Sequence, residues 1–477
     1  MEYIPTVGLE VHAQLNTKTK IFCGCKTSFG DPPNTHTCPV CLGLPGALPV
    51  LNNEVLKKAV LAGLAINATI HHKSKFDRKN YFYPDLPKAY QISQFDEPYC
   101  TKGKITIEKE NGEKKIIGVT RIHMEEDAGK LMHSENPSIQ ESYVDLNRAG
   151  TPLIEIVSEP EIDSPEEAVL YLAELKSILE YIEVSDCNME QGSLRVDANI
   201  SVRPENTSKL GTRAEIKNLN SFKAVKAALE YEIERQIDLI NSGGVVVQET
   251  RLWNALTNQT MPMRSKEEAH DYRYFPEPDL VPVILDDDEI SAISGAMPEL
   301  AGAKKERFIK EYLLPEYDAG VLTADKTYAI YFEEIVEKKV PAKKASNWIM
   351  AEMLAFAAEK DCGLNDLCSS KDLAALLLEV ESGRISGKIA KMVFAEMIET
   401  KKGPLEIIKN KGLVQISDES SIVPVVEEVL AENQESVESF KNGKDKALGF
   451  LVGQVMKKTQ GKANPPLVNK LLLERLK

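Results

Sequence analysis

Apolar and polar residues alternate along two stretches of the chain. Between residues 7 and 15 every odd position is apolar, whereas the even positions include Glu10 and His12. Residues 194–203 alternate in the same way. Because successive side chains of a β-strand point to opposite faces, both stretches predict strands with one face on a core and one face open.

Helical patterns lie between and after these strands. Ser164-Pro165-Glu166-Glu167 predicts a capping box with proline at the first helical position, opening a helix that runs to about Ile182. A second helix is expected from about Ser221 to Asn241, because Gly243-Gly244 follows. Helices mixed with open strands are typical of an α+β domain.

The signals change twice along the chain, which suggests where domains meet. Strands and helices mix up to residues 285–288, only helical patterns remain from about 298 to 400, and a further shift comes at 401–404. The 477 residues are enough for several domains of ordinary size. We expect an α+β body followed by two helical modules, with domains at 1–292, 293–404 and 405–477.

Composition restricts the class of protein. Apolar residues make up 43% of the chain and charged residues 27%, as in soluble globular proteins. No stretch approaches the roughly eighteen apolar residues of a membrane span, and residues 1–5 lack the features of a signal peptide. We therefore expect a cytoplasmic protein without a membrane partner.

Four cysteines near the N-terminus form two close pairs, Cys23-x-Cys25 and Cys38-x-x-Cys41, with a turn-rich stretch between them. Thiolates at this spacing can surround one zinc ion tetrahedrally. The alternatives are two disulfides, which a reducing compartment disfavours, and four unrelated thiols. A closed four-thiolate site leaves no position for a substrate, so we expect a structural Zn²⁺ knuckle at 23–41.

The net charge of −15 argues against a nucleic-acid partner, but the distribution of charge argues for one. Residues 441–477 hold nine basic and two acidic residues, a net charge of +7, so the rest of the chain carries −22. This segregation predicts a phosphate-binding appendage, with candidate contacts at Lys446, Lys457, Lys458 and Lys462. A solvated helical surface would give the same composition, and both interpretations stay open.

Acids and imidazoles share the polar faces of the expected strands. Glu10 and His12 project in the same direction from the first strand. The strand expected at 118–125 carries three polar residues on one face, Arg121, His123 and Glu125. Glu155 is the one charged residue of the apolar strand 153–157; it is either buried with a partner that satisfies its charge or in water on an edge strand.

Carboxylates gathered on one face of a sheet repel each other, and a divalent ion relieves that repulsion. Such oxygen-rich sites suit Mg²⁺, which commonly binds nucleotide phosphates too. Several basic residues of this region could bind ATP, and spacing alone nominates no single one; they include Lys79, Arg195, Arg213 and Lys217, with Asp197 as a further oxygen ligand. The chain has no P-loop and no G-x-G-x-x-G fingerprint, so ATP would lie on an open sheet. Aromatic clusters at 81–84 and 271–276 could stack on a nucleotide or a tRNA end, or could belong to the core.

Several long motifs occur together: VGLEVH at 7–12, FDRKNYFYPD at 76–85, HMEEDAGK at 123–130, VDLNRAGTPLIEI at 144–156, GSLRVDAN at 192–199 and DYRYFPEPD at 271–279. With this set the chain closely resembles the B subunit of the glutamyl/aspartyl-tRNA amidotransferases, the GatB family, over essentially its whole length. The resemblance implies a glutamine-synthetase-like cradle, a helical domain and a YqeY-like tail that contacts tRNA. It also implies a Mg²⁺ site at Glu10, His12, Glu125 and Glu155, and a zinc knuckle found in some members.

The activity implied is ATP-dependent phosphorylation of the side-chain carboxylate of mischarged Glu-tRNA(Gln) or Asp-tRNA(Asn), followed by amidation with ammonia. No amidase-like loop is found in the sequence. The resemblance therefore implies a heterotrimer, in which a glutaminase subunit supplies the ammonia and a small third subunit holds the other two together. Two other functions stay open: a non-catalytic RNA-binding scaffold, and a free-standing amino-acid kinase or ligase.

Overall fold

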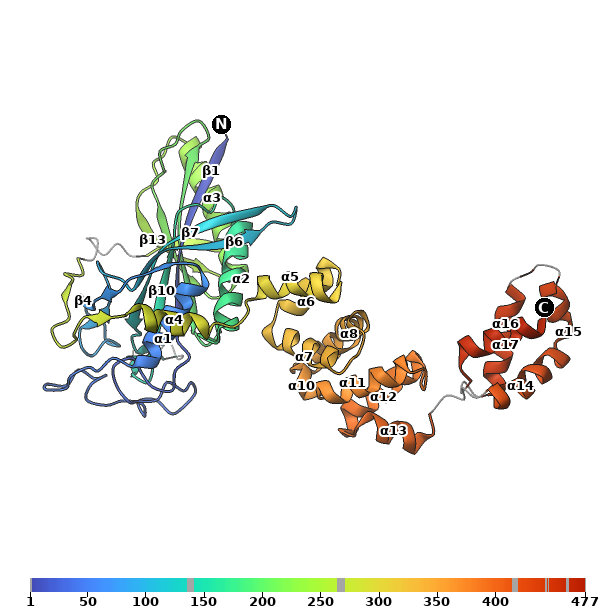
Figure 1. The fold of residues 1–477 in the computed structure, drawn as a ribbon. Helices are drawn as coiled ribbons and strands as arrows, with labels where there is room; N and C mark the ends of the chain where they lie inside the picture. The colour runs from blue at the N-terminus through green and yellow to red at the C-terminus, as the bar shows by residue number, and fades with distance from the viewer. Residues whose placement is uncertain are drawn as a thin grey trace. The chain divides into compact units, whose positions relative to one another are not determined.

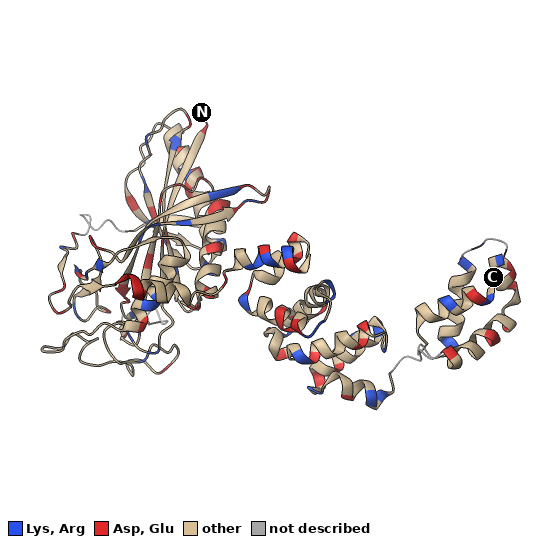
Figure 2. Cartoon of the chain, in the orientation of Figure 1, with Lys and Arg blue, Asp and Glu red and all other residues tan. Residues whose placement is uncertain are grey.

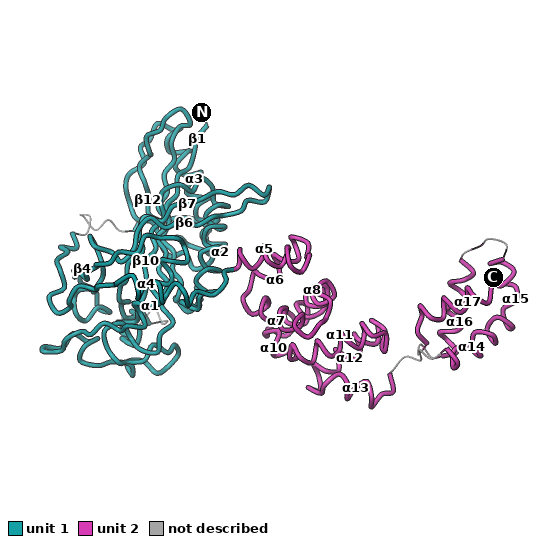
Figure 3. Tube along the Cα trace, viewed as in Figure 1, with its two compact units in different colours: residues 1–300 teal, residues 301–477 magenta. Residues whose placement is uncertain are grey.

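The computed structural model describes residues 2–134, 141–263, 271–413, 419–441, 444, 446–459 and 463–476. The chain divides into two compact units, residues 1–300 and 301–477 (Figure 3). The first unit mixes strands and helices, and in its described part the second unit is helical. This order confirms the expected α+β region followed by an all-helical region. The predicted division into three domains at 292 and 404 stays a prediction.

The first unit is built on a nine-stranded sheet with the order β14-β13-β12-β11-β1-β10-β7-β6-β2 (Figure 1). Its strands are β1 Tyr3–Gln14, β2 Thr69–Ile70, β6 Cys100–Glu108, β7 Lys114–Glu126, β10 Pro152–Ser158, β11 Leu194–Pro204, β12 Ala214–Leu219, β13 Glu249–Asn254 and β14 Gln259–Pro262. β12 and β13 are parallel, and the other neighbours in this sheet are antiparallel. The first strand of the chain therefore lies inside the sheet, between β10 and β11.

Among the residues that the structure describes, three small sheets accompany the large one. They are β15 Phe275–Pro276 with β4 Asp77–Asn80 and β5 Tyr90–Ser93, β16 Val283–Ile284 with β3 Lys73–Ser74, and β8 Lys130–His133 with β9 Ser142–Asp145. The first of these carries two of the motif segments and packs on the large sheet through β5 and β7.

The described part of the first unit contains four helices: α1 Asn53–Ala65, α2 Pro165–Tyr181, α3 Phe222–Asn241 and α4 Asp287–Gly295. The predicted helix starts are observed. Ser164 accepts a hydrogen bond from the backbone N–H of Glu167 at 3.1 Å, and Ser221 caps α3 in the same way. The carboxylate of Glu167 does not complete the expected capping box; it accepts from the Asp163 N–H and pairs with lysines of the neighbouring hairpin.

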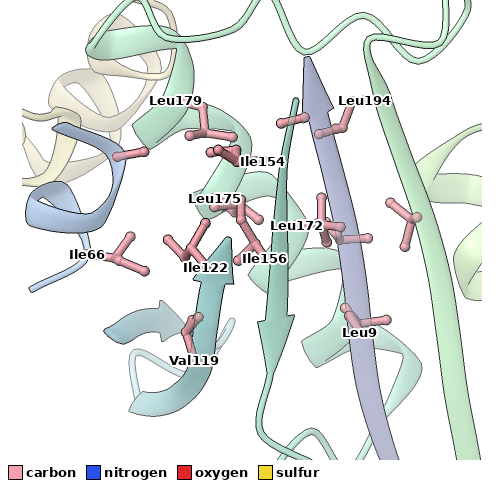
Figure 4. Packing of buried hydrophobic residues seen from close by; sticks show 14 of the residues in the cluster. Leu9, Ile66, Val119, Ile122, Ile154, Ile156, Leu172, Leu175, Leu179 and Leu194 are labelled. Carbon is pink, nitrogen blue, oxygen red and sulfur yellow. The ribbon is translucent and has the colours of Figure 1, made fainter. Parts of the chain in front are cut away.

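The core lies between the sheet and these helices. The apolar series of β1, including Leu9, meets Ile154 and Ile156 of β10 and the apolar face of α2, including Leu172 and Leu175 (Figure 4). Each of these five side chains is at most 1% exposed. Since neighbouring residues of a strand point to opposite faces, burial of this series turns the polar series of the same strands to the other face of the sheet.

The second unit contains two separate hydrophobic clusters in its described residues. The first cluster belongs to α5 Ala301–Tyr312, α6 Glu316–Thr323, α7 Lys326–Glu337, α8 Ala342–Trp348, the π-helix Ile349–Met353, α9 Leu354–Lys360, α10 Leu364–Leu367, α11 Ser370–Glu381, α12 Gly387–Thr400 and α13 Pro404–Lys411. The second belongs to α14 Glu419–Glu432, α15 Gln434–Lys441, α16 Lys446–Lys458 and α17 Pro465–Leu476.

No helix among the described residues is both long enough and apolar enough to cross a membrane.

Candidate functional site

A row of ionisable side chains crosses three neighbouring strands of the large sheet. In the strand register, His12 of β1 lies opposite Glu155 of β10, and Glu155 lies opposite His123 of β7. Both imidazoles approach the same carboxylate oxygen: the Nε2 atoms of His12 and His123 are each 3.3 Å from Glu155 Oε2. Glu155 is only 7% exposed, because β10 is an inner strand, and this excludes the edge-strand alternative.

Glu125 lies two residues further along β7 and completes a compact group. One ligand atom each from His12, Glu125 and Glu155 lie within 4.8 Å of one another. The two oxygens of Glu125 also accept hydrogen bonds, one from Gln91 Nε2 at 2.9 Å and one from Ser93 Oγ at 2.8 Å. Two buried carboxylates and one imidazole form an oxygen-rich donor set that fits a divalent cation such as Mg²⁺.

The electrostatics of this group favour bound positive charge. Burial raises the pKa of Glu155, but the facing charge of His123 and the hydrogen bond from His12 outweigh it and hold the pKa well below its usual range. Burial acts in the same direction on Glu125, yet Lys79 and His123 lower its pKa to about 2. Burial lowers the pKa of His123, but Glu155 and Glu125 together raise it to about 9. The carboxylates are thus ionised, the form that binds a cation, and His123 and Lys79 are their charge partners.

Glu10 lies on the same face but outside this three-residue group. It is opposite Asp197 in the β1–β11 register, and its Oε1 accepts a hydrogen bond from Asn199 Nδ2 at 2.9 Å. Burial raises the pKa of Glu10, and the neighbouring acids Glu155 and Glu215 raise it further. Glu10 therefore lies beside the group of His12, Glu125 and Glu155 and is not one of the three residues whose ligand atoms converge.

The residues predicted to bind ATP lie at different distances from the group of His12, Glu125 and Glu155. Lys79 Nζ lies 3.7 Å from Glu125 Oε2, and Arg195 donates to Asp127 Oδ2 at 2.9 Å. Lys217 donates to Asp197 at 2.7 Å, two strands away from His12. Arg213 lies just before β12, is exposed and makes no ion pair within the described part of the chain.

Aromatic side chains line the side of the group nearest Lys79. The ammonium of Lys79 lies 5.2 Å above the ring of Tyr272. Tyr274 stacks on Phe95 at a centroid distance of 4.1 Å and an angle of 7°. Phe95 is 54% exposed, so this stacked pair presents a flat apolar surface rather than a core contact. The segment 271–276 thus contributes to the site face and not to the core of the sheet.

The four cysteines of the predicted knuckle lie together. The Sγ atoms of Cys23, Cys25, Cys38 and Cys41 are within 4.8 Å of one another. Four converging sulfurs without a disulfide are the donor set of a structural zinc site. The knuckle is fixed to the segment after β9, where Asn147 Oδ1 accepts a hydrogen bond from the backbone N–H of His36 at 2.8 Å.

The basic residues near the C-terminus are less segregated in space than in sequence. Both Lys and Arg (blue) and Asp and Glu (red) occur on α14–α17 (Figure 2). Lys458 pairs with Glu428 at 2.8 Å and with Glu432 at 2.7 Å, and both acids belong to α14. Lys446 and Lys457 are exposed and form no ion pair with a described residue. Lys462 lies outside the described residues.

His123 contacts the group of His12, Glu125 and Glu155 but was not among the residues predicted to bind the metal. It stands on the same strand face as Glu125, and this spacing was visible in the sequence. Its partner is Glu155, which is distant in sequence and is reached only through the β7–β10 register. Gln91 and Ser93, which hold Glu125, come from the small sheet and carry no sequence pattern that points to the site.

Comparison with known proteins agrees with the motifs. A family model described as the GatB/GatE catalytic domain matches residues 5–291, and one described as the GatB domain matches residues 330–476. The chain is 58% identical over 477 residues to the B subunit of the aspartyl/glutamyl-tRNA(Asn/Gln) amidotransferase of Caldanaerobacter subterraneus subsp. tengcongensis, and the match covers 100% of both chains. It is 57% identical over 480 residues to the same protein of Caldicellulosiruptor bescii, covering 100% of this chain and 99% of that one. For Geobacter sp. the identity is 55% over 478 residues, with both chains fully covered. These end-to-end matches confirm the resemblance, and the chain belongs to the GatB family.

Proposed function

We propose that this chain activates the side-chain carboxylate of Glu-tRNA(Gln), Asp-tRNA(Asn) or both with ATP and converts it into an amide. The observation that carries the proposal is the group of His12, Glu125 and Glu155, whose two carboxylates are buried, with Lys79 beside it. Relatives that match from end to end bear the name of this amidotransferase, which supports the same conclusion.

The proposed reaction has two chemical steps. The carboxylate oxygen of the aminoacyl group attacks the γ-phosphorus of ATP, the bond to the β-phosphate oxygen breaks, and ADP leaves with that electron pair. Ammonia then attacks the carbonyl carbon of the acyl phosphate, inorganic phosphate leaves, and the nitrogen loses a proton to give the amide. The first step is needed because a carboxylate oxygen is a poor leaving group and phosphate is a good one.

The site residues would hold charged reactants close together. His12, Glu125 and Glu155 would bind Mg²⁺, and Glu10 would add a further donor from the next row. When bound, the ion neutralises charge that builds up on the phosphate oxygens. ATP would be positioned on the open sheet by four basic residues, because ammonium and guanidinium groups bind phosphate through charge-assisted hydrogen bonds. These residues are Lys79, Arg195, Arg213 and Lys217, and Asp197 accepts a hydrogen bond from Lys217.

Bringing two anionic substrates together on one rigid face contributes to the rate in a second way. An oriented encounter becomes effectively unimolecular, and orientation is worth on the order of 7 kcal/mol in favourable systems. The inner strands β1, β7 and β10 that carry the group are held by the core on their other face. In the proposed assignment, this sheet unit is a glutamine-synthetase-like cradle and 405–477 is a YqeY-like tail that contacts tRNA.

Ammonia would come from a partner protein. We propose a heterotrimer in which a glutaminase subunit releases ammonia and a small third subunit joins the other two, since the relatives are named as one part of a multisubunit enzyme. We also propose that the four cysteines hold structural Zn²⁺, because four converging sulfurs match its preferred tetrahedral ligand set.

Amidation of both mischarged tRNAs by the assembled complex, with ATP and glutamine or ammonium, tests the proposal. Glu125→Gln should lower amidation by about 100-fold or more, because it removes a charge that binds the metal and orients phosphate. Glu205→Gln, an exposed acid just after β11, should leave the rate unchanged. tRNA affinity should be equal in wild type and in both variants.

The same assay separates the competing functions. A non-catalytic scaffold would show no ATP hydrolysis with mischarged tRNA, and a free-standing kinase or ligase would hydrolyse ATP without tRNA. The isolated chain should not hydrolyse glutamine. Full amidation by Glu125→Gln would remove the assignment of His12, Glu125 and Glu155 as the reaction site.

A further inference from the structure

Lys20 is a buried cation that follows β1, and its side chain is 0% exposed. Its Nζ donates to the carbonyl oxygen of His36 at 2.6 Å and lies 3.4 Å from the carbonyl oxygen of Leu146. Among the described residues no Asp or Glu forms an ion pair with it. An ammonium group taken out of water is costly unless negative charge is nearby.

The nearest negative charge would be the cysteine cluster. Lys20 Nζ lies 3.7 Å from Cys41 Sγ, which also accepts from the backbone N–H of Cys38 at 3.2 Å. Four thiolates around one Zn²⁺ leave a formal double negative charge, which the buried ammonium would reduce. A buried ammonium beside Cys41 is therefore better explained if the four cysteines are thiolates around a metal ion than if they are neutral thiols.

The aliphatic part of the Lys20 side chain is also closely packed. Gly150 has φ +82°, and a Cβ built on it would lie 3.4 Å from Lys20 Cδ and 3.5 Å from Cys41 Cβ. The backbone N–H of Ile21 donates to the Gly150 carbonyl oxygen at 3.0 Å. Lys20 therefore joins the knuckle to the segment 146–150 through its side chain as well as through the neighbouring backbone.

That segment leads directly to the proposed reaction site. Arg148 donates to the Gly129 carbonyl oxygen at 2.6 Å, and the Gly150 N–H donates to the Asp127 carbonyl oxygen at 2.8 Å. The carboxylate of Asp127 in turn accepts from Arg195. We propose that Lys20 is a positioning residue of the zinc knuckle, which balances the charge of the metal-thiolate cluster and fixes the cluster to the segment that supports Asp127. This inference rests on the proposed zinc site.

The first test measures zinc retention in the purified full-length chain. Zinc content is determined by mass spectrometry, and release to a coloured chelator is followed over time. Lys20→Met should release zinc about 10-fold faster or more, which is the usual effect of removing a group that supports metal ligands. Lys18→Met is the matched control, because Lys18 is exposed in the same segment, and it should behave as wild type.

The second test separates charge from packing. Unfolding temperatures are compared for zinc-loaded and zinc-free protein of wild type, Lys20→Met and Lys20→Gln, which keeps an N–H donor but no charge. We expect both variants to lose more stability in the loaded protein than in the zinc-free protein, since the negative charge is greatest with the metal bound. A packing role alone would lower both temperatures equally, and that result would overturn the proposal.

Unchanged zinc release in both variants would overturn it too. If Lys20→Met does not fold, Lys20→Gln decides the question in both measurements. Wild-type protein that binds no zinc would remove this inference together with the zinc site, but amidation activity in the same preparation would leave the proposed reaction intact.

Discussion

His123 offers a quantitative check of the charge arrangement in the site. The charged groups that face it are Glu155 on β10 and Glu125 on its own strand, with His12 on the far side of Glu155. These carboxylates raise the pKa of His123 from 6.5 to about 9 against the opposing effect of burial. At roughly 1.4 kcal/mol per pKa unit, the rise corresponds to about 3 kcal/mol of folding stability.

The sign follows from the direction of the shift. A histidine whose pKa is raised by folding stabilises the folded state fully below its unfolded pKa, and this contribution is lost as the pH rises through the folded pKa. In magnesium-free buffer, the unfolding free energy of wild type should therefore fall by about 3 kcal/mol between about pH 6.5 and pH 9.5. His123→Gln should abolish that part of the decline, since glutamine does not titrate.

Urea unfolding followed by tryptophan fluorescence can measure this in one unit alone. The chain has two tryptophans, and Trp253, which is 3% exposed, belongs to the sheet unit. A Trp348→Phe background leaves Trp253 as the reporter of that unit. His133→Gln, at an exposed histidine on β8, is the control and should keep the wild-type pH dependence. The charge assignment is wrong if wild type shows no decline, or if His123→Gln declines as steeply.

Two further predictions concern substrate binding in the assembled enzyme. Lys79→Met should raise the KM for ATP roughly tenfold while tRNA affinity stays the same, because a charge-assisted hydrogen bond to phosphate is worth about 1.5–3 kcal/mol; an unchanged KM would remove Lys79 from the phosphate site. Lys457→Ala should weaken tRNA binding and reduce its salt dependence by about one phosphate contact, whereas Lys458→Ala should have a smaller effect because that lysine is already paired within the tail. Filter binding at several salt concentrations measures the tRNA affinity of both variants and its salt dependence. Equal losses of affinity in Lys457→Ala and Lys458→Ala would contradict the distinction between the two lysines.

Local sequence patterns were sufficient to predict the elements that carry the site. The stretch of alternating apolar and polar residues from residue 7 lies in strand β1, and helices α2 and α3 begin after Ser164 and Ser221, as predicted. These predictions succeeded because the period of side chains and the capping of a helix depend on a few neighbouring residues.

Pairings between distant segments were not accessible in the same way. The contact between His123 and Glu155 depends on the register of β7 and β10, and no local pattern in the sequence defines that register. The spatial pairing of charge was hidden in the same way: Lys458 and Lys470 pair with glutamates of α14, which precede them in the chain and were counted with the acidic body. Net charge along a sequence is not net charge on a surface.

The place of β1 inside the sheet has a consequence for synthesis of the protein. Its two neighbours are made much later, since β10 ends at Ser158 and β11 at Pro204. At about 5–20 residues per second, on the order of ten to forty seconds pass between completion of β1 and completion of β11. Until β10 is made, the nascent N-terminal segment has both backbone edges unpaired and an apolar side exposed, and one edge stays without its partner until β11 is made. Such a segment is exposed to aggregation and to binding by chaperones. The first strand translated therefore has both of its partners only after six of the nine strands of the sheet have been made.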